Sequence, residues 1–191
     1  MGGMMRLTVF KYLLLIVGIL VLTTPIASAA NEANSDNSKS AIAERPSGTE
    51  LKGGWHFVRT RNPQGGADAI SIMHTADVSR SDLDLAGLMI RCSERGAEVV
   101  IVLLQPFSLR ARPHVVFGKP GSETQFEATV APPGTAVLVP RDAASLVGGP
   151  WQTLNDLFIL VDDGQSTIRG VVALVGLQAA FNVLMTSCPA R

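Results

Sequence analysis

The sequence has few of the residues from which enzymes build catalytic centres. Its 191 residues include two cysteines, three histidines and one tyrosine. The histidines show no HxH or HExxH spacing, no serine lies in a G-x-S-x-G motif, and no glycine-rich phosphate loop opens a helix. These absences argue against the common zinc, serine-hydrolase and nucleotide-binding enzymes. We therefore interpret the chain as non-enzymatic and expect no cofactor.

Neither sign of charge is in excess. The chain has 16 basic and 16 acidic residues. Removal of residues 1–29 would take away Arg6 and Lys11 and no acidic residue, which leaves 14 basic against 16 acidic side chains, a net charge of −2. This balance gives no electrostatic reason to bind nucleic acid or an anionic membrane, so neither is expected as a partner.

The first 29 residues have the pattern of a secretory signal peptide. Arg6 and Lys11 supply the positive region, residues 12–22 the apolar core, and Ala27-Ser28-Ala29 a small-residue cleavage site. Retention of this segment as an uncleaved anchor is the alternative, although the core is short for a bilayer span. We expect a periplasmic or secreted protein, with no stable membrane span after cleavage.

The residues that follow divide into a linker and a domain. Residues 30–50 are polar and contain no aromatic side chain. Such a segment buries too little apolar surface to offset the entropy of ordering, so a flexible lead-in is predicted. Residues 51–191 are numerous enough for one domain with a hydrophobic core.

Short apolar stretches between turn residues are typical of a mostly β domain. Residues 55–59 and 68–74 enclose the turn Asn62-Pro63-Gln64-Gly65-Gly66 and predict a hairpin. The continuous apolar run at 98–104 is expected of a strand covered on both faces. Further strands are predicted at 87–92, 114–117, 124–130, 136–139 and 157–161. The pattern predicts an antiparallel β-sandwich or open barrel with one C-terminal amphipathic helix packed on it.

Residues 167–188 predict a strand, a break at Gly176 and an amphipathic helix. The apolar side chains after Leu177 recur at the spacing of one helical face, at Ala180, Phe181, Leu184, Met185 and Cys188. A membrane-spanning helix at 170–187 is the alternative. The polar residues Gln178 and Asn182, which recur on one side, argue against it.

The two cysteines are predicted to form one disulfide. Cys92 ends an alternating run that contains Leu88 and Ile90, and Cys188 ends the apolar face of the predicted helix. Each cysteine is therefore in line with the buried face of its own element. In an exported protein this favours a Cys92–Cys188 bridge, and two free buried thiols are the alternative.

Two Arg-x-Arg pairs and one tryptophan are candidate binding residues. On an extended chain, Arg59 with Arg61 and Arg110 with Arg112 would each point to one side and clamp a carboxylate or phosphate. Solvated surface arginines are the alternative. Trp151, beside a Gly-Gly-Pro turn, is a candidate interface anchor, and burial in the core is its alternative.

A metal-dependent hydrolase is the enzyme alternative. His56 and His74 lie on the predicted hairpin and would face each other across it, with Asp162 or Asp163 as a third ligand. Histidines at a solvated strand edge are the competing interpretation, and no metal site is assigned. Asp82 and Asp84 form a carboxylate pair in a polar connection, where a solvated surface is expected.

Three short motifs give the chain an outline similar to a known family. They are the strand that opens at Trp55, L-x-I-R-C at 88–92, and G-L-x-x-A-(x)3-L-(x)3-C at 176–188. This outline resembles the VasI/TagO-like accessory proteins of type VI secretion, and VALVGLQAAFNVL is similar to the ending of invasion-associated locus B proteins. The resemblance implies an exported β-rich domain framed by a first-cysteine strand and a last-cysteine helix.

Together these features predict an exported, non-enzymatic protein of a bacterial envelope. Its expected role is that of a protein-binding or secretion-accessory module, and its expected partner is another envelope or secreted protein. The alternatives are a small metal-dependent hydrolase that uses His56, His74 and an aspartate, and a protein that binds an anionic ligand through its arginine pairs.

Overall fold

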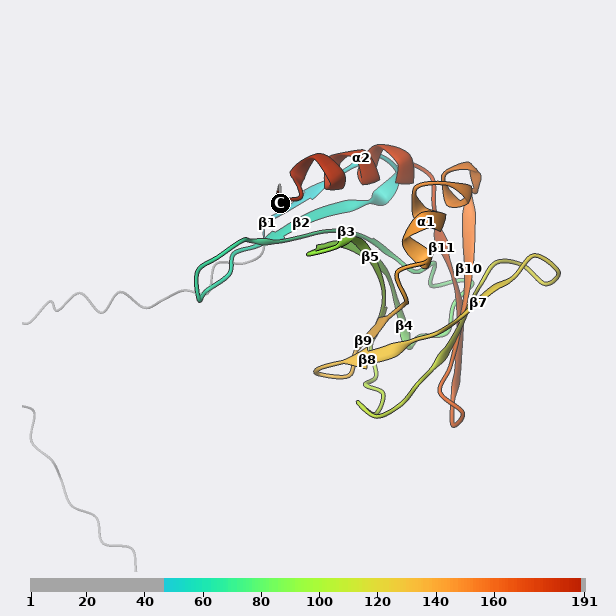
Figure 1. Cartoon of the computed structure of the whole chain (residues 1–191). Helices are drawn as coiled ribbons and strands as arrows, with labels where there is room; N and C mark the ends of the chain where they lie inside the picture. Colours follow the sequence, from blue (N-terminus) through green and yellow to red (C-terminus); the bar gives the residue numbers. More distant parts are fainter. Residues whose placement is uncertain (1–46, 190–191) are drawn as a thin grey trace, which may run out of the picture. The chain divides into compact units, whose positions relative to one another are not determined.

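The computed structural model describes residues 47–189. The predicted signal peptide and nearly all of the predicted lead-in lie outside these residues. The described part contains two antiparallel β-sheets and two α-helices, the second of which lies alongside the larger sheet (Figure 1). The predicted fold class, a mostly β antiparallel domain with a C-terminal helix packed on it, is confirmed.

The two sheets contain seven and four strands. The larger sheet has, in spatial order, β1 (Ser47–Glu50), β2 (His56–Thr60), β3 (Ala69–Thr75), β4 (Leu85–Ser93), β5 (Gly96–Leu103), β9 (Ala136–Leu138) and β8 (Thr129–Ala131). The smaller sheet has β11 (Thr167–Ala173), β10 (Asp156–Asp162), β6 (His114–Phe117) and β7 (Thr124–Glu127). The first strand, β1, lies inside the predicted lead-in, so the last four residues of that segment belong to the sheet.

The sheets share one hydrophobic core. On the larger sheet, Leu88 lies opposite Ile101 and Ile90 lies opposite Val99, and all four are buried. Successive side chains of a strand point to opposite faces, so this set defines the inward face. The inward side chains of the smaller sheet include Val115, Phe117, Leu157, Ile159, Val161 and Val172. Burial of each such side chain stabilises the fold by about 1.5–3 kcal/mol.

Both sides of the smaller sheet are connected to the larger one. The chain of β7 continues through the buried Ala128 into β8 and so passes from one sheet to the other (Figure 1). On the opposite side, residues 76–82, here called the edge segment, run along β11. The Asp77 N–H donates to the Val171 carbonyl at 2.8 Å, and the Val171 N–H donates to Ser81 Oγ at 2.9 Å. The edge segment thus provides hydrogen-bond partners for backbone groups on the outer edge of β11.

Helix α2 (Leu177–Ser187) packs against β3 and β4. Leu177, Ala180 and Leu184 are buried, as their helical spacing predicted. Residues 170–187 therefore comprise the end of a strand, a turn and a helix. This confirms the predicted strand, break and amphipathic helix over a membrane-spanning helix. Within residues 47–189, no helix is both long and apolar enough to cross a bilayer.

Two glycines make room for the start of α2. Gly176 precedes the helix with a φ of 85°, and Gly53, in the 3₁₀ turn η1 (Lys52–Gly54), has a φ of 79°. A Cβ on Gly176 would collide with the Lys52 carbonyl, and a Cβ on Gly53 would collide with the Val175 carbonyl. Only glycine combines this left-handed backbone with so close an approach.

The predicted disulfide is present. Cys92 near the end of β4 and Cys188 immediately after α2 are bonded across 96 positions of sequence. The bridge ties the closing helix to the middle of the larger sheet. Such a bond is characteristic of an oxidising, non-cytoplasmic environment.

Arg80 fixes the edge segment to the smaller sheet. Its Nε donates to Asp77 Oδ2 at 2.6 Å, and its two terminal nitrogens donate to the two oxygens of Asp156 at 3.1 and 3.0 Å. Hydrogen bonds from the side chains of Ser79 and Arg80 lower the pKa of Asp77 to about 2. The hydrogen bond from Arg80 also lowers the pKa of Asp156.

We expect Arg80→Gln to lower the melting temperature near neutral pH and to have less effect in acid. Both aspartates have a folded-state pKa below their unfolded value of about 3.9. Their contribution to the free energy of unfolding is therefore complete above about pH 4 and is lost as the pH falls toward 2. Because all three side chains are partly exposed, the effect is modest. Thermal melts of both proteins between about pH 7 and 2 check this; a pH-independent difference contradicts it.

Candidate functional site

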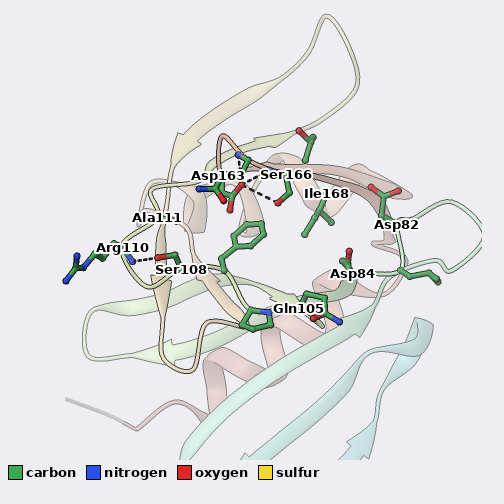
Figure 2. A pocket seen from close by; sticks show the side chains of 14 residues that line it. Asp82, Asp84, Gln105, Ser108, Arg110, Ala111, Asp163, Ser166 and Ile168 are labelled. Carbon is green, nitrogen blue, oxygen red and sulfur yellow. Dashed lines mark hydrogen bonds between the residues drawn. The ribbon is translucent and has the colours of Figure 1, made fainter. Parts of the chain in front are cut away.

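An open groove of about 1120 Å³ lies where three connections meet. These are the end of the β3–β4 connection, the β5–β6 connection and the β10–β11 turn with the start of β11 (Figure 2). Its lining includes Asp82, Leu83, Asp84, Phe107, Asp163 and Ile168.

The first wall of the groove is held between β11 and β5. The Arg169 N–H donates to Asp82 Oδ2 at 2.7 Å, and the Asp82 N–H donates to the Arg169 carbonyl at 2.8 Å. Two residues later, the Asp84 carbonyl accepts from the Leu104 N–H at 2.9 Å. These bonds fix the Asp82 carboxylate and the backbone of residues 82–84, with Leu83 between the two aspartates.

The opposite wall is the β10–β11 turn, which has the predicted Asp-Asp-Gly chemistry. Gly164 N–H donates to Asp162 Oδ1 at 2.8 Å. Asp163 Oδ1 accepts from the backbone N–H groups of Gln165 and Ser166 and from the Ser166 hydroxyl. The Ser166 backbone bond is the main cause of the lowered pKa of Asp163. The Asp163 carboxylate therefore stabilises the turn.

The floor and lip of the groove are apolar. Phe107 and Ile168 form the floor and are almost completely buried. Leu83 lines the groove and is 77% exposed. Two further exposed leucines lie on the β5–β6 connection next to lining residues but do not line the groove: Leu104, which is 62% exposed, precedes Gln105, and Leu109, which is 51% exposed, follows Ser108. We call these three leucines the lip. Exposed apolar side chains gathered at a concave site are typical of an interaction surface.

The arginine pairs do not come together as one anion site. Of the four predicted residues, only Arg110 lines the groove, and its guanidinium points away from Asp82 and Asp84 (Figure 2). Arg110 and Arg112 lie in an irregular connection, so the alternation argument does not apply to them. Arg112 donates to the neighbouring Ala111 carbonyl at 3.3 Å.

The other pair is on β2 and just beyond it. Arg59 lies opposite Ile70 on β3, and its Nε is 4.0 Å from Asp68 Oδ2. Arg61 follows the end of the strand. Neither side chain lines the groove.

The interface interpretation of Trp151 is wrong, because its side chain is 3% exposed. It lies in the 3₁₀ turn η2 (Pro150–Thr153) and packs edge-on against Phe117 with ring centroids 4.9 Å apart. The turn residues before it direct the indole into the core. Trp151 is a core residue, as its alternative interpretation held.

The expected facing of His56 and His74 is also wrong. His56 pairs with Met73, so the two histidines point to opposite faces of the hairpin. The His74 ring nitrogens lie 2.8 and 2.9 Å from the backbone carbonyl oxygens of Thr75 and Gly53. Within residues 47–189, no group of three or more His, Cys, Asp or Glu side chains is placed to hold a metal ion.

A second open pocket of about 720 Å³ lies beside the disulfide. Its lining includes Cys92, Cys188 and Met185. Met185 is the one large apolar side chain of its described lining that is highly exposed, as Leu83 is in the lining of the groove.

Sequence reasoning missed the groove because its walls come from three connections distant in the chain. The only local sign was the carboxylate pair Asp82 and Asp84, interpreted as a solvated surface. No family model, curated protein or solved structure that we compared with the chain matches it. The function is therefore argued from the groove's own residues.

Proposed function

We propose that this chain is a non-enzymatic protein-binding domain of a bacterial envelope and that the groove is its binding site. The lip carries the proposal. Leu83 exposes a large share of its apolar surface in the lining itself, and the exposed Leu104 and Leu109 lie on the connection that forms one side of the groove, with the Leu104 N–H bonded to the Asp84 carbonyl. Single exposed leucines are ordinary, whereas a cluster beside a groove is typical of a surface that a protein partner covers.

Export supports an envelope or secreted partner. The disulfide is typical of proteins that fold in an oxidising compartment, and the N-terminal 29 residues have the pattern of a secretory signal. The outline that resembles the VasI/TagO-like accessory proteins supports a secretion-accessory role. On this proposal the protein works in the periplasm or outside the cell.

The chemistry of the groove supports binding over catalysis. Its described lining contains no histidine and no cysteine, so the Ser–His and Cys–His pairs of covalent catalysis cannot form among those residues. Asp82 and Asp163 accept backbone hydrogen bonds that hold the walls in place. The groove is thus a concave surface with fixed walls on which a ligand can bind.

Site-specific photocrosslinking in the producing cell tests this proposal. We expect a photoreactive residue at Leu104 or Leu109 to form a covalent adduct with one envelope or secreted protein, identified by mass spectrometry. The same residue at Leu154 or Val183, which are exposed and lie in segments that contribute no residue to the groove, is the matched control. We expect the same adduct to form when this protein and the identified partner are purified and mixed. Equal adducts at all four positions, or none at the lip, contradict the proposal.

A further inference from the structure

The carboxylate of Asp84 differs from the other two in the groove. Asp82 and Asp163 each accept backbone hydrogen bonds, whereas the Asp84 carboxylate has no hydrogen bond or ion pair with any residue of the described part. Asp84 is nevertheless only partly exposed, and the carbonyl of the same residue is fixed by Leu104. Its side chain is therefore held at the groove with unused hydrogen-bond acceptors (Figure 2).

The charge of the lining favours a cationic occupant. Three acidic side chains, Asp82, Asp84 and Asp163, line the groove with one basic side chain, Arg110. Three negative charges and one positive charge leave a formal charge of −2. The Arg110 guanidinium is directed away from Asp84, so the carboxylate side of the groove is uncompensated (Figure 2). Complementary charge across an interface supplies specificity and speeds association.

The apolar floor and lip decide what kind of cation fits. Phe107, Ile168 and the exposed Leu83 line the same groove as the carboxylates, and the exposed Leu104 is bonded through its N–H to the Asp84 carbonyl. A small hydrated cation would leave these side chains uncovered. A lysine or arginine side chain places an apolar stem beside a charged head, and apolar neighbours in the same segment would cover the lip.

We propose that the groove binds an extended segment of a partner protein in which a lysine or arginine lies between apolar residues, with the cationic head on Asp84. This inference rests on the proposed function and specifies the chemistry of its partner. The groove's volume of about 1120 Å³ suits a segment of several residues. The lip contacts the flanking apolar side chains, and Asp84 selects the basic one.

Fluorescence anisotropy with a designed peptide tests this inference. The probe is a labelled heptapeptide that alternates leucine and lysine, and its matched control carries glutamate in place of lysine. We expect the lysine peptide to bind full-length oxidised protein and the glutamate peptide not to bind. Asp84→Asn should weaken binding about tenfold or more, the effect of one charge-assisted hydrogen bond.

Two controls separate this site from general electrostatics and from misfolding. Asp142→Asn removes the same charge at the start of α1 (Ala143–Val147), outside the groove, and should leave the affinity within about twofold. Leu104→Ser should weaken binding, whereas Leu154→Ser should not. The Asp84 side chain makes no bond within the described part, so Asp84→Asn should melt like the wild type.

The outcomes distinguish the two proposals. Adducts at the lip together with equal peptide affinity for wild type and Asp84→Asn would overturn the cationic-segment inference and leave the protein-binding function standing. Equal binding of the lysine and glutamate peptides would do the same. Lysine-dependent binding that Asp84→Asn and Asp142→Asn weaken equally would also overturn the inference, because it would reflect net charge. If free spermidine bound as tightly as the peptide, the inference of a protein segment would be overturned, because a small cation would be sufficient as the ligand.

Discussion

Reduction of the Cys92–Cys188 bridge is expected to lower the free energy of unfolding by about 2–5 kcal/mol. The bridge closes a loop of 96 positions, and loops of that length lie at the upper end of the range because the unfolded chain loses the most freedom. It also holds Cys188, at the end of α2, against the larger sheet. Urea unfolding of the protein with and without a reductant measures the change.

The double variant Cys92→Ser with Cys188→Ser is the control for the reductant itself. It should match the reduced wild type in stability and should not respond to reductant. A wild-type protein that unfolds at the same urea concentration in both redox states would show that the bridge contributes nothing to the fold.

Leu184→Ala is expected to cost about 2–5 kcal/mol of stability. Leu184 is fully buried on the inward face of α2, and its removal leaves a cavity between the helix and the larger sheet. This loss is comparable to the loss of the disulfide. It would lower the melting temperature by roughly 2–4 °C for each kcal/mol in a chain of this length.

Val183→Ala is the matched control on the same helix. Val183 is 38% exposed, and alanine is the better helix former, so this change should stay within about 0.5 kcal/mol of the wild type. Equal effects of the two substitutions would mean that α2 does not pack through the face described above.

The features that could be predicted from the sequence are those that depend on local residue patterns. The hairpin of β2 and β3 followed from two alternating runs around a glycine-rich turn, and α2 followed from the spacing of Leu177, Ala180 and Leu184. The disulfide followed because Cys92 and Cys188 each continue an apolar face. Each inference needed only neighbours in the chain.

The features that were missed depend on contacts between distant residues. The register of the hairpin decides that His56 faces away from His74, and a shift of one residue reverses that outcome. The burial of β5 on both faces, by contrast, was predicted: Val99 and Ile101 lie in the shared core, and Val100, on the opposite face between Met89 and Leu138, is buried as well.

The groove could not be predicted for the same reason. Asp84 comes next to Leu104 only because the β3–β4 connection bonds to the end of β5. The edge segment, which fixes Asp82 against Arg169, has no strand pattern of its own. Nothing in either stretch alone indicates that two carboxylates and the exposed Leu83 will line one concavity.

NMR mapping of the lysine peptide on the isotope-labelled, oxidised protein is the most direct test of the groove as the binding site. We predict amide shifts at 82–84, 105–111 and 163–168, with the largest changes near Asp84 and Leu104. Shifts confined to the pocket beside Met185 and Cys188, or spread evenly over the surface, would contradict the assignment of function to this groove.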